Sequence, residues 1–431
     1  MLSTIVIFIA ALHVAVTFPE SLPSSVKLLV LATYGFLGAT SFISVLVQNV
    51  KKTKLDLFRS MLLLKAIGCI IAFPYYYLEE NAEKMSAAVR EQLLISVISA
   101  ALFVLGRVVL PKLRIFHSVR LGYAALFMVP GALLLARLTG PNTYGSYLSV
   151  GGILVFSICM VLMPPATAAA FSDMRTVNRL NPRLTALSGG ELIFILTLGV
   201  IAVLSGKVNH EYGIVMIFVG CLGGLVFFMY GRSAGSKVIF SLTAVGLSLY
   251  VLQTSAKVMT RLSVILHLKE QWNRGHLSGE ATPLYFFMLR VRGAGFYGYG
   301  NAMLSRKLYP TALNDYIFTT MIYNHGLILG ILAFLLAISM CRQIMRTPAI
   351  GRFDTILVQS IGITMASIYI TSFLGNIGSM PLTGISPVFL ASAGRSMDAA
   401  GALMLGVAAG VEGRADARTR NGKKKRDLWQ S

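Results

Sequence analysis

Long apolar stretches alternate with short polar ones along the chain from residue 2 to residue 411. Each apolar stretch is about 18 to 25 residues long, which suffices for an α-helix to cross the roughly 30 Å hydrocarbon core of a bilayer. The pattern therefore predicts an all-α, polytopic membrane protein with about twelve membrane-spanning helices. We place these spans at residues 2–18, 27–48, 59–78, 91–111, 118–138, 147–171, 188–205, 212–230, 236–255, 314–341, 356–378 and 388–411.

The composition supports a membrane protein and excludes several other classes. The 431 residues are 55% hydrophobic and 13% charged, with a mean hydropathy of +0.72. Soluble globular chains are about a quarter charged, so a soluble enzyme, a nucleic-acid-binding protein and a disordered chain are all excluded. The four cysteines lie within or beside apolar stretches, and we expect no disulfide framework.

The net charge of +21 is distributed unevenly between the two sides of the predicted spans. Lys and Arg concentrate in alternate loops, at 51–59, 112–120, 175–183, 232–237 and 342–352, and the intervening short loops hold few. Cytoplasmic loops carry the excess of basic residues in membrane proteins, so both termini are predicted to be cytoplasmic. We expect these loops to contact anionic membrane lipids, with no nucleic-acid partner.

Two segments lie outside this alternation of spans and short loops. Residues 256–313 form one long loop, which the alternation places on the outer side, where loop length removes the charge constraint. Residues 413–431 are polar and basic, and we predict a disordered cytoplasmic tail near anionic headgroups. A long loop in a chain with few others is where we expect function.

Three of the ionisable residues inside predicted spans stand out: Lys65, Arg107 and Glu191. Because a charge in hydrocarbon is costly, such side chains usually face the bundle interior or a wet cavity. We therefore predict a polar pocket for a headgroup, with Glu191 offsetting the charge of Lys65. The alternative for Arg107, which lies near a span end, is a side chain that reaches to the interface.

Motifs of several other enzyme classes are missing from the sequence. The six histidines show no metal-ligand spacing, and the chain has neither a P-loop nor a Gly-x-Ser-x-Gly elbow beside a histidine and an acid. We expect no metal and no cofactor, and the sequence gives no indication of a divalent cation.

The outer loop combines cations, glycines and carboxylates. Arg290 and Arg292 precede a glycine cluster at 293–300, and Glu270 and Glu280 lie upstream. Arginine binds phosphate or pyrophosphate through its planar fork, and a nearby carboxylate can act as general base toward a sugar hydroxyl. The alternative is a solvated basic loop whose glycines serve only backbone turns or close helix approach.

Two stretches of the chain resemble motifs of a known family. The first contains Gly-Ala-Gly-Phe-Tyr-Gly-Tyr-Gly-Asn from residue 293, then Leu308-Tyr309-Pro310 and Asn314-Asp315-Tyr316-Ile317-Phe318. The second contains Pro381-Leu382-Thr383-Gly384-Ile385, followed by Pro387, Phe389, Gly394 and Ser396. Both are similar to motifs of the SEDS family (shape, elongation, division and sporulation proteins), the group of FtsW, RodA and SpoVE. Weaker similarity lies at residues 142–152 and around Glu211.

The resemblance implies a ten-helix SEDS-like core over residues 56–412, preceded by two extra spans within residues 1–55. It further implies a bacterial cytoplasmic-membrane protein of cell division, elongation or sporulation. Such proteins polymerise lipid II, a lipid-linked disaccharide-pentapeptide, into peptidoglycan glycan strands at the outer membrane surface. They pair with a class B penicillin-binding protein.

The chain departs from the family at the proposed catalytic position, an aspartate in the outer loop. Residues 256–313 hold no aspartate, so Glu270 is the best substitute carboxylate and Glu280 the second. Asp315 is the other catalytic candidate, although a residue at the start of a span also suits a helix N-cap. The substrate-binding candidates are Arg261, Arg290, Arg292, Lys65, Glu191, Glu211, Thr383 and Gly384.

Three hypotheses follow from these residues and the resemblance. The first is a divergent SEDS glycosyltransferase in which arginines bind pyrophosphate and Glu270 acts as base. The second is a SEDS-fold protein that has lost catalysis and serves as a scaffold of a divisome or elongasome. The third is a transporter of a lipid-linked precursor.

Overall fold

The computed structural model describes residues 2–16, 18, 20–51, 55–77, 82–108, 149–150, 153–172, 290–300, 313–380, 384–392 and 395–430, together with isolated positions between 242 and 270. Its helices are α1 (Leu2–Val16), α2 (Ser24–Lys51), α3 (Asp56–Tyr76), α4 (Ala82–Val108), α6 (Val155–Ser172), α13 (Ile317–Met345), α14 (Gly351–Asn376) and α15 (Arg395–Gln430). A short antiparallel pair, β1 (Ser149–Val150) and β2 (Ile153–Leu154), precedes α6. Apart from this pair, the elements named here are helical, as predicted.

Hydropathy predicted several of these helices closely. Five helices in the described ranges are long and apolar enough to cross a membrane, namely α2, α3, α4, α13 and α14. The predicted spans 27–48, 59–78, 314–341 and 356–378 coincide with α2, α3, α13 and α14 to within a few residues at each end. The predicted spans 118–138, 188–205, 212–230 and 236–255 lie outside the described residues except for isolated positions. The total of about twelve spans and the cytoplasmic termini therefore stay predictions.

Three helices begin at other residues than expected. α4 begins at Ala82 instead of residue 91, because its polar first turns extend the helix beyond the apolar stretch. α6 begins at Val155 instead of 147, because the β1–β2 pair precedes it. α15 begins at Arg395 instead of 388, because residues 384–392 form a turn.

The end of α15 also differs from the prediction. The segment from residue 413 was expected to be disordered, but α15 continues as one helix to Gln430. Alanine, arginine and lysine, which are frequent in this segment, are strong helix formers, so a polar basic sequence is compatible with a helix.

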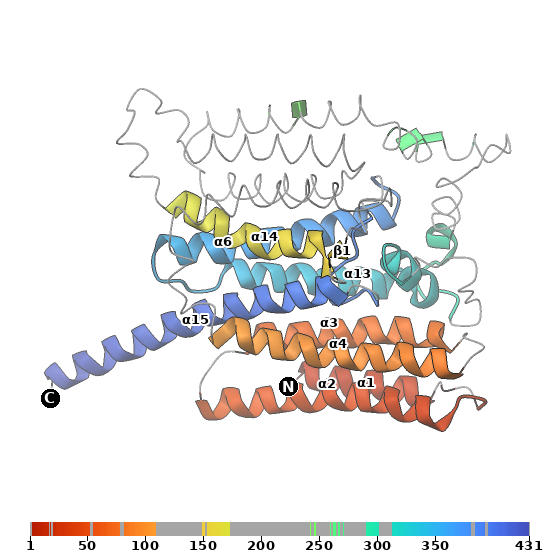
Figure 1. Cartoon of the computed structure of the whole chain (residues 1–431), viewed down its shortest axis with the longest axis horizontal. Coiled ribbons are helices and arrows are strands. Elements are labelled where there is room, and N and C mark those ends of the chain that lie inside the picture. Colours follow the sequence, from red (N-terminus) through yellow and green to blue (C-terminus); the bar gives the residue numbers. More distant parts are fainter. Residues whose placement is uncertain are drawn as a thin grey trace.

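The helices lie side by side with nearly parallel axes (Figure 1). α1 and α2 form one edge of the bundle, where α1 packs on α3, and α2 packs on α3 and α4. Thr4 of α1 and Ser41 of α2 share a buried hydrogen bond of 2.8 Å between their hydroxyls. α14 packs on α13 and α6, and α15 joins this side of the bundle to α4.

Glycines bring α4 and α15 into close backbone contact. A Cβ atom on Gly406 would lie 2.2 Å from the carbonyl oxygen of Phe103, and one on Gly106 would lie 2.5 Å from that of Leu403. In a membrane, helices associate through van der Waals packing, which small residues at the crossing permit. The close contact of α4 with α15 is therefore possible only because Gly106 and Gly406 have no side chains.

Two arginine–aspartate ion pairs lie at one end of the bundle. Arg59 pairs with Asp56 at the start of α3, and Arg414 of α15 contacts Asp354 of α14 at 2.9 Å. The far end of α14 is Asn376, which hydrogen-bonds to the backbone of Asp315. Arg59 and Arg414 therefore lie at the end of the bundle opposite Asp315, and the orientation with Asp315 on the outer side stays a prediction.

We expect labelling from the two sides of the membrane to follow this arrangement. In a variant whose four cysteines are replaced by alanine, Arg292→Cys should react with a membrane-impermeant maleimide in intact cells. Arg418→Cys should react only after permeabilisation, because it lies beyond Arg414 on α15. Labelling of Arg418→Cys in intact cells, with Arg292→Cys protected, would show that the orientation is reversed.

Candidate functional site

The two motif-like stretches meet at the Asp315 end of the bundle. The hydroxyl of Ser386 donates a hydrogen bond of 3.1 Å to the carboxylate of Asp315, across 71 positions of sequence. Asp315 is half-buried just before α13, and Ser386 lies in the turn before α15. One predicted catalytic residue is therefore held by the second motif, whose Ser386 was not among the predicted site residues.

Asn376 fixes the backbone that carries Asp315. Its side-chain amide donates to the carbonyl of Asp315 at 2.7 Å, and its side-chain oxygen accepts from the backbone N–H of Thr319 at 3.0 Å. α13 begins at Ile317, its N-cap position is Tyr316, and no side-chain hydrogen bond caps it. The N-cap alternative for Asp315 is therefore not what the structure shows.

The glycine cluster of the outer loop docks against a break in α13. Gly326 lies within α13 with non-helical dihedrals, φ 86° and ψ 167°. The backbone N–H groups of Tyr299 and Gly300 donate to the carbonyls of Tyr323 and Asn324, both at 2.8 Å. These bonds use carbonyl groups that the helix break leaves without a helical partner.

Two glycines allow this approach. A Cβ atom on Gly326 would lie 1.9 Å from the carbonyl oxygen of Phe296, and one on Gly298 would lie 2.4 Å from the backbone nitrogen of Gly326. Both glycines also have positive φ, 86° and 73°. The alternative that glycines of the 293–300 cluster serve turns and close backbone approach is confirmed at Gly298, whereas Gly326 was not among the glycines for which it was predicted.

Arg290 lies where this loop meets the bundle. Its guanidinium carbon is 4.8 Å from the centre of the Tyr323 ring, a cation–π distance. Tyr75, near the end of α3, lies close to the side chains of Thr320 and Asn324 and within electrostatic range of Arg290. The cation is thus oriented among aromatic and polar groups of α3 and α13, as an arginine that binds an anionic group requires.

The two other outer-loop candidates that the structure describes are exposed. Arg292 lies on the surface, and the side chain of Glu270 is 63% exposed. Glu270 contacts His267 at 3.6 Å, one helical turn earlier. The structure therefore brings Arg290 against α13 but leaves Glu270 in solvent beside a histidine.

Lys65 has a different partner from the one expected. Its ammonium contacts the carboxylate of Asp398 at 2.6 Å, and the two side chains are only 4% and 1% exposed. We expected Glu191 in this role, so the prediction missed Asp398. The signal was present in the sequence, because Asp398 is also an ionisable residue inside a predicted span, 388–411.

The remaining predicted residues are placed as follows. Gly384 has φ 69°, which favours glycine, and it leads into the turn that contains Ser386. Arg107 lies in the last turn of α4 within electrostatic range of Glu412, and whether its side chain reaches to the membrane interface stays a prediction. The candidates that lie outside the described residues are Arg261, Glu191, Glu211, Glu280 and Thr383.

No group of three or more His, Cys, Asp or Glu side chains that would hold a metal ion occurs in the described residues. Two buried cysteines, Cys69 and Cys341, are free thiols. The chemistry that the described site offers is thus that of a carboxylate, a hydroxyl and an arginine.

Comparison with known proteins supports the fold. No family model matches the sequence, and no curated protein matches it either. A chain of a peptidoglycan synthase complex that coordinates polymerization and crosslinking is similar in structure, with 14% identity, a TM-score of 0.57, and coverage of 82% of this chain and 97% of that chain.

Two structures of the rod shape determining protein RodA of Thermus thermophilus are also similar. An aspartate-to-alanine variant has 13% identity and a TM-score of 0.54, and the match covers 84% of this chain and 98% of the RodA chain. The RodA structure without that substitution has 13% identity and a TM-score of 0.53, and the match covers 84% of this chain and 97% of the RodA chain. The expected SEDS-type fold is confirmed, in a divergent sequence.

The docked loop predicts a difference between two glycines that share the same backbone conformation. Gly326 and Gly351 both have φ 86°, but a Cβ atom on Gly351 would meet nothing within 4 Å. Gly351→Ala should cost about 1–2 kcal/mol of stability from the left-handed conformation. Gly326→Ala should cost the same amount for its backbone conformation plus ~1–3 kcal/mol for the clash with Phe296.

The measurement is the midpoint of unfolding of both variants in the same detergent. Equal midpoints would contradict the close packing of the loop against α13.

Proposed function

We propose that this protein is a glycosyltransferase of the bacterial cytoplasmic membrane that polymerises lipid II, or a related lipid-linked sugar, into glycan strands. The observation that carries the proposal is that Ser386 holds the carboxylate of Asp315 just before α13, while Arg290 lies against Tyr323 of the same helix. The RodA-type fold supports the same conclusion, since one similar chain comes from a peptidoglycan synthase complex.

The proposed reaction is an attack of a sugar 4-hydroxyl on the anomeric carbon of a second, lipid-linked sugar. The new C–O bond forms as the bond to undecaprenyl pyrophosphate breaks, and that pyrophosphate leaves with the electron pair. A carboxylate accepts the proton of the attacking hydroxyl. Arginine stabilises the charge that develops on the leaving pyrophosphate.

Asp315 is the carboxylate best placed for the role of base. Ser386 orients its side chain and Asn376 orients its backbone, so the group is held in position before substrate binds. Arg290, which stacks on Tyr323, would contact the pyrophosphate. Glu270 is a second candidate base that a substrate would have to draw inward, because it is exposed in this structure.

The partner under this proposal is a class B penicillin-binding protein, which would crosslink the strands that the membrane protein polymerises. The similarity to a chain of a complex that coordinates polymerization and crosslinking supports such a pairing. A scaffold without catalysis is the second candidate function. The absence of any aspartate from residues 256–313 favours it.

Purified protein incubated with labelled lipid II should yield glycan polymer. Asp315→Asn should lower the rate about 100-fold or more, because the amide keeps the acceptor for Ser386 but accepts no proton. Arg290→Ala should lower it about tenfold or more through loss of a charge-assisted hydrogen bond to pyrophosphate. Glu20→Gln, which removes an exposed carboxylate between α1 and α2, is the matched control and should leave the rate unchanged.

Glu270→Gln separates the two candidate bases. If Asp315 is the base, the Glu270 variant should retain activity within about threefold, because its side chain is exposed. Loss of product in Glu270→Gln with activity retained in Asp315→Asn would transfer the role to Glu270. A folded wild-type protein that forms no polymer, yet co-purifies with a penicillin-binding protein, would favour the scaffold.

A further inference from the structure

We propose that the buried Lys65–Asp398 ion pair is a positioning device, which holds the turn of residues 386–390 so that Ser386 presents its hydroxyl to Asp315. The proposal rests on the proposed function and extends it to two residues that act through the turn. Lys65 belongs to α3 and Asp398 to α15, so the pair joins two helices beneath the candidate site.

The two oxygens of the Asp398 carboxylate bind different groups. One accepts from the Lys65 ammonium at 2.6 Å, and the other accepts from the backbone N–H of Phe389 at 2.6 Å. Lysine thus fixes the carboxylate, and the carboxylate fixes the turn. Hydrogen bonds to a buried charged group are short and strong, so this link resists displacement.

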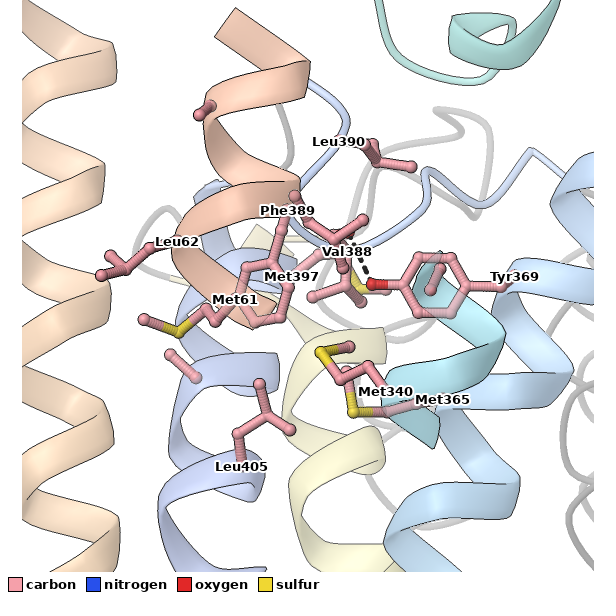
Figure 2. Packing of buried hydrophobic residues seen from close by; sticks show 14 of the residues in the cluster. Met61, Leu62, Met340, Met365, Tyr369, Val388, Phe389, Leu390, Met397 and Leu405 are labelled. Carbon is pink, nitrogen blue, oxygen red and sulfur yellow. Dashed lines mark hydrogen bonds between the residues drawn. The ribbon is translucent and has the colours of Figure 1, made fainter. Parts of the chain in front are cut away.

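The turn needs such a restraint because Phe389 has an unfavourable backbone conformation. Its φ of 64° makes it the one non-glycine residue with positive φ among the residues that the structure describes. Such a conformation persists only where the surroundings enforce it. Figure 2 shows one of the other restraints, a hydrogen bond of 2.9 Å from the Tyr369 hydroxyl to the carbonyl of Val388.

Close packing restrains the same turn from α3. A Cβ atom on Gly68 would lie 2.6 Å from the carbonyl oxygen of Leu390, so helix and turn are in direct backbone contact. Gly68 follows Lys65 by one helical turn, on the same face of α3. The ion pair and the glycine therefore hold adjacent parts of one turn.

The turn contacts the Asp315 segment on both sides of Phe389. On the N-terminal side of Phe389, the Ser386 hydroxyl donates to the Asp315 carboxylate at 3.1 Å. On the C-terminal side of Phe389, the backbone N–H of Ser392 donates to the carbonyl of Leu313 at 2.9 Å. A shift of Phe389 would therefore be transmitted to Asp315 from two directions.

Two double variants isolate the bond to Phe389. Lys65→Met with Asp398→Asn removes both charges but keeps a side-chain oxygen that accepts from Phe389. Lys65→Met with Asp398→Leu removes the charges and the acceptor. Neither leaves an unpaired buried charge, so both are expected to fold.

We expect kcat for glycan polymerisation to be at least tenfold lower in the Leu double variant than in the Asn double variant, with similar KM for lipid II. Adding Asp315→Asn should abolish this difference, because the pair acts through Asp315. Amide hydrogen exchange at Phe389 should be at least tenfold faster in the Leu double variant. The control, Arg414→Met with Asp354→Leu, removes the ion pair at the opposite end and should leave kcat unchanged.

The outcomes separate this proposal from the proposed function. Equal exchange at Phe389 in the two double variants would overturn the positioning role, whatever the activities are. Faster exchange with equal kcat, or a kcat difference that persists without Asp315, would overturn the link to the site. If the wild-type protein itself makes no glycan, the proposed function fails, and the exchange contrast still decides whether the pair holds the turn.

Discussion

The ion pair between Lys65 and Asp398 is the contact on which the Asp315 end of the bundle depends. Taking an isolated charge out of water costs several kcal/mol even after relaxation, and the bilayer core supplies no water to compensate. Removing one partner of such a pair typically costs about 3–5 kcal/mol, because the other charge stays buried. α3 and α15 must therefore stay in contact at this point, and the turn that leads into α15 is held with them.

Irregular backbone at membrane depth is tolerated only where protein groups satisfy it. In the part of the chain that the structure describes, the break at Gly326 and the turn around Phe389 are examples of irregular backbone. Loop amides satisfy the first, and side chains of Tyr369 and Asp398 satisfy the second. Residues of the candidate site adjoin both places: Ser386 precedes Phe389 in the turn, and Arg290 lies against Tyr323 near the break. Irregular backbone frees polar groups from regular helical hydrogen bonds. The same constraint thus shapes the fold and supplies its polar chemistry.

Hydropathy was sufficient to predict most of the described helices, because each must bury an apolar surface of membrane thickness. It did not predict where α4 and α15 begin, since polar turns extend one helix and a packed turn shortens the other. The site was predicted in part. The motifs indicated Asp315 and Gly384, and the cost of a buried charge indicated Lys65. The partners were missed, because Asp315–Ser386 and Lys65–Asp398 join residues 71 and 333 positions apart, and no local pattern encodes such contacts.

If the protein has the proposed activity, the structure also bears on which of the two candidate carboxylates would act as the base. A resemblance of motifs directs attention to the outer loop, where the family has an aspartate and this chain has Glu270. An exposed side chain beside His267 has no fixed orientation toward a substrate, so it must lose conformational freedom before it reacts. Asp315 has already lost that freedom, through Ser386 on its side chain and Asn376 on its backbone. A carboxylate that the fold orients in advance is the better candidate base, and sequence spacing alone gives no measure of that orientation.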